Sequence, residues 1–240
     1  MLRKTMKLKL DELCLYVFVS LGGFLFGSIL LAIISYSERG SDDYGVVPLG
    51  TMFAMMIMGF LPLLIGMLGQ YQSFNCFITF GKTRKRFFVC DLAVNFIWYL
   101  ITGILIIGLY YLESGMFRLF YADYPREVIF SVRLLVWAVP AAAFVQVILR
   151  MFLGSVIMRF GKKALWIIWA FWMAVCILPV RIADFIKSGA HEGAAGVFHK
   201  IAGVAEAVPL AVWGTAGVVL LLVLGVISWR LIRKQAVVVS

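Results

Sequence analysis

Six long apolar runs are the feature that most limits how this chain can fold. A membrane-crossing helix needs roughly 20 apolar residues, and six stretches approach that length, at about 13–36, 46–69, 87–111, 129–158, 164–180 and 208–229. The fifth is short for a full crossing, and we expect it to continue into the segment that follows. Only 14% of the residues are charged, against about a quarter in soluble domains. We therefore expect an all-α polytopic membrane protein with one transmembrane domain over residues 1–240.

The basic residues indicate how these spans are oriented. Most of the 22 Lys and Arg residues lie in the first residues of the chain, in the loops after the second and fourth spans, and in the C-terminal tail. Basic loops are retained on the cytoplasmic side of a membrane, so both termini are expected in the cytoplasm. The net charge of +10 then reflects topology and attraction to anionic membrane lipid, and we expect no nucleic-acid partner.

Residues 1–12 are expected to form an amphipathic elbow helix in the inner membrane interface. Four apolar residues recur on one side at helical spacing, namely Leu2, Met6, Leu10 and Leu13. Such a face suits the boundary between headgroups and acyl chains. Because Leu8 and Lys9 disturb the pattern, a frayed basic tail is the alternative.

The segment between spans two and three, residues 70–88, combines aromatic residues, a glycine and a basic cluster. Its first part predicts a short helix that brings four aromatic side chains near one another: Tyr71, Phe74, Phe77 and Phe80. Gly81 suits the end of that helix, and Thr83 suits the N-cap of the next one. Four cations mark the segment as cytoplasmic; they are Lys82, Arg84, Lys85 and Arg86.

The segment between spans five and six, Arg181–Ala207, is too polar to cross lipid but retains helical spacing of its apolar residues. We expect two short amphipathic helices that dip into the outer leaflet and leave His191 in water. A long extracellular hairpin is the alternative.

The sequence also argues against several kinds of chemistry. Gly81-Lys82-Thr83 ends like a phosphate-binding loop, but Cys76 stands where that motif requires glycine. The two histidines, His191 and His199, have no third residue beside them to complete a metal site. No histidine lies in a span to activate a nucleophile. We therefore expect no catalytic or metal site on this chain.

Polar residues inside spans are costly and are candidate functional residues. Asp91, near the inner end of span three, is expected to pair with Arg86 or Lys85, or with a cytoplasmic partner. The pair with a neighbouring cation would serve topology alone. Asn95 lies one turn further in and is expected to face a protein interface.

Two arginines lie in span four. Arg150 either snorkels to the inner headgroups or lines an inner cavity, and Arg133 is expected to snorkel outward. In span five, Trp166 and Trp169 either share a face toward a second protomer or anchor the helix at the membrane interface.

In the order of these elements, the chain resembles the permease subunit of type-2 ABC transporters. The most specific likeness is FGKTRK at residues 80–85, which is similar to the inner-loop motif of small Gram-positive permeases. Those permeases export peptides such as phenol-soluble modulins or confer immunity to peptides. The resemblance implies a coupling helix at Tyr71–Gly81 that contacts a cytosolic ATPase, and re-entrant helices at Arg181–Ala207.

The resemblance further implies a bacterial cytoplasmic membrane, a pair of permease protomers as a homodimer, and ATP and Mg bound by the ATPase rather than by this chain. The residues that it places at the ATPase contact are Tyr71, Phe74, Asn75, Phe77, Phe80, Gly81, Lys82, Thr83, Arg84, Lys85 and Arg86.

The expected function is ATP-driven export of an amphipathic peptide or a lipid-like molecule. A largely apolar interior with a few cationic residues favours such cargo over a sugar or a metal ion. Export is preferred to import because the sequence contains no soluble domain that would receive a substrate. The alternative is the substrate-binding membrane module of a vitamin-type importer, which would need a polar pocket near the outer face.

Overall fold

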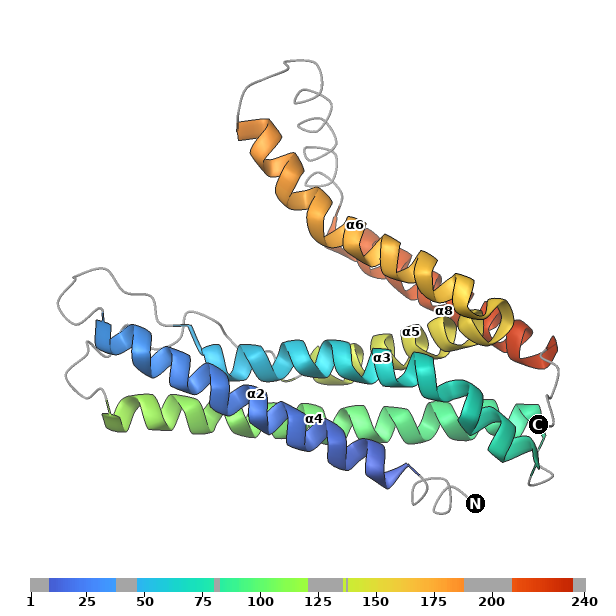
Figure 1. Cartoon of the computed structure of the whole chain (residues 1–240), viewed down its shortest axis with the longest axis horizontal. Coiled ribbons are helices and arrows are strands. Elements are labelled where there is room, and N and C mark those ends of the chain that lie inside the picture. Colours follow the sequence, from blue (N-terminus) through green and yellow to red (C-terminus); the bar gives the residue numbers. More distant parts are fainter. Residues whose placement is uncertain are drawn as a thin grey trace. The chain divides into compact units, whose positions relative to one another are not determined.

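The protein is helical throughout the part of the chain that the structure describes, which comprises residues 9–37, 47–79, 83–120, 136, 138–187 and 209–234. The helices of this computed structural model (Figure 1) are α2 (Leu10–Ser37), α3 (Leu49–Thr79), α4 (Arg84–Phe120), α5 (Ala138–Phe160), α6 (Lys162–Lys187) and α8 (Leu210–Lys234). The predicted all-α class is confirmed for these residues. Most of the expected elbow helix, and residues 188–207 of the outer segment, lie outside them.

Five of these helices, α2, α3, α4, α5 and α8, are long and apolar enough to cross a membrane. The protein is therefore a multi-pass membrane protein. The expected fifth span corresponds to α6, which includes the apolar stretch Lys163–Ala174 and continues through further apolar residues to Val180 and as a helix to Lys187. A sixth crossing stays a prediction. Span four was expected to start at residue 129, whereas α5 begins at Ala138 and the residues before 136 are outside the described part.

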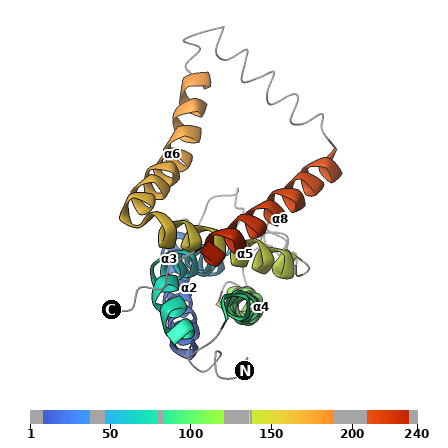
Figure 2. The same cartoon turned by 90° about the vertical axis from the view of Figure 1, so that its right-hand side faces the viewer.

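The described residues form two compact units, divided between Met151 and Phe152 of α5. In the first unit, α2, α3 and α4 lie alongside one another and consecutive helices are antiparallel (Figures 1 and 2). Phe24 of α2, Ala54 of α3 and Leu109 of α4 meet in one buried cluster. This apolar contact holds the three helices together and fixes which face of each helix points inward.

The segment from residue 70 of α3 to Phe87 of α4, which we call the inner turn after the cytoplasmic side expected from its charges, differs from the predicted separate coupling helix. With 31 residues, α3 is about 46 Å long at 1.5 Å per residue, well beyond a hydrocarbon core of roughly 30 Å. Residues 70–79 are thus an extension of the span, and 80–82 lie outside the described part. The expected N-cap is confirmed, because the Thr83 hydroxyl accepts a hydrogen bond from the backbone N–H of Arg86 at 3.3 Å.

Aromatic packing closes this inner turn. The ring of Phe87 in α4 makes edge-to-face contacts with Phe74 and Phe77 of α3, with ring centroids 5.3 and 5.5 Å apart. Phe74 and Phe87 are buried. Such ring contacts stabilise a pair by about 0.5–1.5 kcal/mol in addition to the free energy from the surface that they bury. They therefore hold the last turns of α3 against the first turn of α4.

The opposite end of α3 is held by Glu113 of α4. Its carboxylate accepts hydrogen bonds from the backbone N–H groups of Gly50 and Thr51, both at 2.8 Å, and from the Thr51 hydroxyl at 2.7 Å. The first N–H groups of a helix have no partner within the helix, and a carboxylate there also complements the helix dipole. Glu113 is buried and therefore acts as a cap supplied by a neighbouring helix.

The second unit contains the end of α5 together with α6 and α8. Gly161, between α5 and α6, has a φ of 66°, in the left-handed region that glycine adopts without steric cost. Trp166 and Trp169 of α6 are exposed and contact each other edge to face, with centroids 5.9 Å apart. The two rings therefore share one face of α6, and its contact with a second protomer or with the membrane interface stays a prediction.

Candidate functional site

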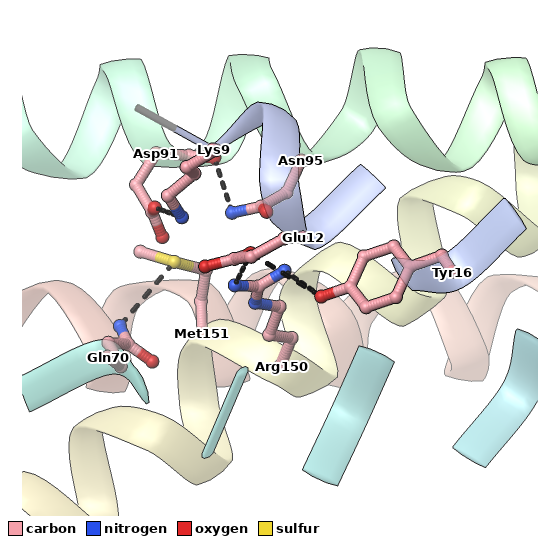
Figure 3. A network of polar contacts seen from close by, with 8 residues as sticks. All are labelled: Lys9, Glu12, Tyr16, Gln70, Asp91, Asn95, Arg150 and Met151. Atoms are coloured by element: carbon pink, nitrogen blue, oxygen red, sulfur yellow. Dashed lines mark hydrogen bonds and ion pairs between the residues drawn. The ribbon is translucent and has the colours of Figure 1, made fainter. Parts of the chain in front are cut away.

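Four charged side chains, three from helices α2, α4 and α5 and one from the residue before α2, meet inside the first unit, near the end where α4 begins (Figure 3). Asp91 of α4 and Arg150 of α5 are each 3% exposed, and Lys9, which immediately precedes α2, is 6% exposed. The side chain of Glu12 in α2 is 22% exposed. We call these four residues the charge network; they carry two positive and two negative charges.

Two ion pairs connect the members of the charge network. The Lys9 ammonium pairs with the Asp91 carboxylate, and Arg150 donates from Nη2 to Glu12 Oε2 at 3.0 Å. Tyr16 completes the second pair, because its hydroxyl accepts from Arg150 Nη1 at 3.2 Å and lies 3.4 Å from Glu12 Oε2. Buried charges persist when they are paired and hydrogen-bonded in this way.

Gly66 of α3 allows Arg150 to lie directly on the helix backbone. A Cβ atom at position 66 would stand 2.3 Å from Arg150 Nε and 2.5 Å from its Cγ, closer than atoms can approach. The missing side chain therefore provides the space that the guanidinium occupies. In this way α3 shapes the site without contributing a charge.

A Gly66→Ala variant tests this close contact. We expect it to displace Arg150 and to destabilise the protein by about 1–3 kcal/mol, the usual cost of overpacking. The matched control is Gly69→Ala on the same helix, where an added Cβ would meet nothing within 4 Å. Thermal unfolding in detergent compares them, and equal transition temperatures for the two variants would contradict the assigned packing.

Uncharged polar groups surround the charge network. Asn95 Nδ2 donates to the backbone carbonyl of Asp91 at 2.7 Å, and Gln70 Nε2 lies 3.6 Å from Met151 Sδ. Among the described residues, Asn95 Oδ1 and Gln70 Oε1 are buried without a hydrogen-bond partner. Unpaired buried acceptors are unfavourable, so this end of the bundle has unused capacity to accept hydrogen bonds.

The partner predicted for Asp91 was wrong. Arg86 and Lys85 are exposed, and their separation from Asp91 by five and six residues puts them on other faces of α4, since side chains three or four residues apart are the ones that meet. Lys9 pairs with Asp91 instead. Asn95 is buried on the same face and bonds within its own helix.

Neither expectation for Arg150 holds. Its guanidinium does not snorkel to the headgroups, because the residue is 3% exposed, and it is engaged by Glu12 and Tyr16 rather than lining an open cavity. Arg133 lies outside the described residues, as do His191 and His199.

The residues expected at an ATPase contact are divided by their burial. Phe74 is fully buried against Phe87 and supports the turn from within. Tyr71, Thr83, Lys85 and Arg86 are exposed, while Asn75, Phe77 and Arg84 are half-buried. Phe80, Gly81 and Lys82 lie outside the described part of the chain.

Sequence reasoning missed the importance of Lys9, Glu12 and Tyr16 in the site, and of Glu113 at the far end of α3. One signal was present: Lys9 interrupts the apolar spacing of the first residues, as expected for a side chain that points into the bundle. Glu113 lay just beyond the predicted end of span three at 111, so it was not counted as an intramembrane carboxylate.

The two ion pairs of the charge network connect α2 and the residue before it to α4 and α5. Within the described residues, no three His, Cys, Asp or Glu side chains lie close enough together to hold a metal ion. The chain matches no known protein-family model, no curated protein and no solved structure.

Proposed function

We propose that this chain is the membrane-spanning subunit of an ATP-driven exporter in a bacterial cytoplasmic membrane, powered by a separate cytosolic ATPase. The observation that supports this proposal best is the inner turn between α3 and α4. It presents the exposed cations Lys85 and Arg86, and it is stiffened by the buried Phe74 and Phe87 rings. A basic, exposed surface at the rigidly packed start of α4 is suited to receive force from a soluble motor.

The charge network offers a route for that force. Asp91 lies less than two helical turns from Lys85 on the uninterrupted helix α4. A displacement of the turn would therefore move Asp91 and, through Lys9, the start of α2. Because Glu12 on α2 pairs with Arg150 on α5, four helices would respond together, with α3 following through Gly66.

The proposed cycle uses two copies of the chain and two ATPases, with ATP and Mg bound by the ATPases. Closure of the ATPases would push on the inner turns and rearrange the helices that form the pathway between the protomers. The exposed face around Trp166 and Trp169 is our candidate for part of the protomer contact. We propose an amphipathic peptide as the cargo, since it could enter from the inner leaflet by burying its apolar face.

Arg86→Glu tests the contact with the ATPase. We expect a loss of about tenfold or more in ATPase retained on the purified chain, because charge reversal at an electrostatically matched contact adds like-charge repulsion. Arg118→Glu is the matched control, since Arg118 is also exposed but lies in the last turn of α4. The measurement is co-purification in detergent with a co-expressed ABC ATPase. Equal retention by both variants would remove the inner turn from the contact.

A further inference from the structure

The first turn of α2, in which we include Lys9 because the N–H of Leu13 bonds to its carbonyl, takes part in both ion pairs of the charge network. Lys9 pairs with Asp91 of α4, and Glu12 pairs with Arg150 of α5. The two carboxylates and two cations are thus arranged as two pairs that each connect α2 to another helix. Detachment of this turn would break both pairs at once.

The charges divide so that such a detachment leaves no net charge behind. Lys9 and Glu12 would leave together, carrying one positive and one negative charge. Asp91 and Arg150 would remain, again with one charge of each sign. Loss of one partner from a buried pair is strongly destabilising, and this division avoids that cost on both sides.

Both alternative pairs are within reach. The N–H of Leu13 bonds to the carbonyl of Lys9 at 3.3 Å, which places Lys9 in the helical register of α2. Glu12 is then three residues further along, at the spacing where side chains on one helix pair. The Asp91 carboxylate and the Arg150 guanidinium already attract each other electrostatically in the observed arrangement.

An unpaired acceptor on α4 provides an independent sign of a second arrangement. Asn95 Oδ1 is buried without a hydrogen-bond partner among the described residues, and Tyr99 on the same helix lies beside Arg150. Asn95 and Tyr99 are four and eight residues after Asp91, on the same face of α4. A guanidinium has five N–H donors, so Arg150 could bond to this face once it leaves Glu12.

We propose that the first turn of α2 is released from the bundle by an exchange of ion-pair partners, in which Arg150 passes from Glu12 to Asp91 and Lys9 passes from Asp91 to Glu12. We call the observed arrangement docked and the other released. Glu12, the most exposed member of the charge network, lies where the turn would separate. The exchange does not depend on an ATPase partner and would apply to any function of this chain.

The exchange predicts opposite effects for two similar substitutions. Glu12→Gln removes the docked partner of Arg150 and leaves Asp91 available to it, so the released fraction should rise. Asp91→Asn removes the carboxylate that Arg150 needs in the released state, so the released fraction should not rise above the wild-type value. If the two ion pairs were independent fixed contacts, both substitutions would loosen the turn.

Pulsed electron paramagnetic resonance measures the released fraction. One spin label is placed at Leu10, the first residue of α2, and the other at Tyr111, in the second half of α4; both positions are exposed. The full-length protein is used, with its four native cysteines replaced by alanine. We expect Glu12→Gln to increase the population of the second distance by about tenfold, equivalent to about 1.4 kcal/mol.

The control is Asp11→Asn, which makes the same change of charge at an exposed position in the same turn and should leave the distances unchanged. If Glu12→Gln does not purify, Glu12→Asp replaces it and should shift the population in the same direction. An increase with Asp91→Asn, or no increase with either Glu12 variant, would overturn the exchange.

Discussion

Replacement of Arg150 by glutamate should prevent the protein from accumulating in a folded state. Arg150 is 3% exposed and is the buried cation that faces Glu12. The variant would place three carboxylates around Lys9 alone, and removal of one partner from a buried ion pair already costs about 3–5 kcal/mol. That cost is comparable to the whole stability of many proteins, which is about 5–15 kcal/mol. The measurement is the yield of monodisperse protein after extraction in mild detergent.

A second substitution makes this prediction specific to the ion pair. Glu12→Arg, added to Arg150→Glu, restores one cation opposite one carboxylate across α2 and α5. We expect part of the yield to return, although the contacts of Arg150 with Gly66 and Tyr16 are lost. Arg159→Glu, an equal charge reversal at an exposed position of α5, should have little effect. A double variant that behaves no better than Arg150→Glu would show that the pairing with Glu12 does not stabilise the fold.

Glu113→Ala should be the next most damaging change. It removes the acceptor of three hydrogen bonds, two of them from backbone N–H groups at the start of α3. Each buried donor left without a partner costs about 1–3 kcal/mol, and few replacements are present in an apolar environment. We expect a large fall in the thermal unfolding temperature and a frayed first turn of α3.

Glu113→Gln separates the loss of charge from the loss of the cap. Its amide oxygen can still accept hydrogen bonds from Gly50 and Thr51, so the fall should be clearly smaller than for alanine. Arg118→Ala, at an exposed position near the end of the same helix, is the control for general weakening of α4. Equal unfolding temperatures for Glu113→Ala and wild type would contradict the capping role.

The helical class of this chain could be predicted because apolar runs of membrane length have few other ways to satisfy their backbone hydrogen bonds. The Thr83 cap was also predictable, since it depends on residues three apart in sequence. The position at which α3 ends was harder to predict. Residues 70–79 contain no glycine or proline that would break the helix, and the contact between Phe74 and Phe87 of α4 stabilises its continuation.

The charge network could be foreseen only in part. Asp91 and Arg150 were recognisable as costly residues within spans, but their partners lie 82 and 138 residues away in the chain. Helical spacing says which side chains share a face and does not say which helix faces them. Gly66 shows the same limit, because its role depends on a side chain from α5.

The central claim is that a cytosolic ATPase drives this chain to move an amphipathic peptide. The most direct measurement is ATP hydrolysis by the ATPase co-reconstituted with this chain in vesicles of bacterial lipid, with and without an amphipathic helical peptide. Our account predicts hydrolysis above that of the ATPase alone, a further increase with the peptide, and loss of both increases with Arg86→Glu but not with Arg118→Glu. Hydrolysis that never exceeds that of the ATPase alone, with or without peptide, would contradict it.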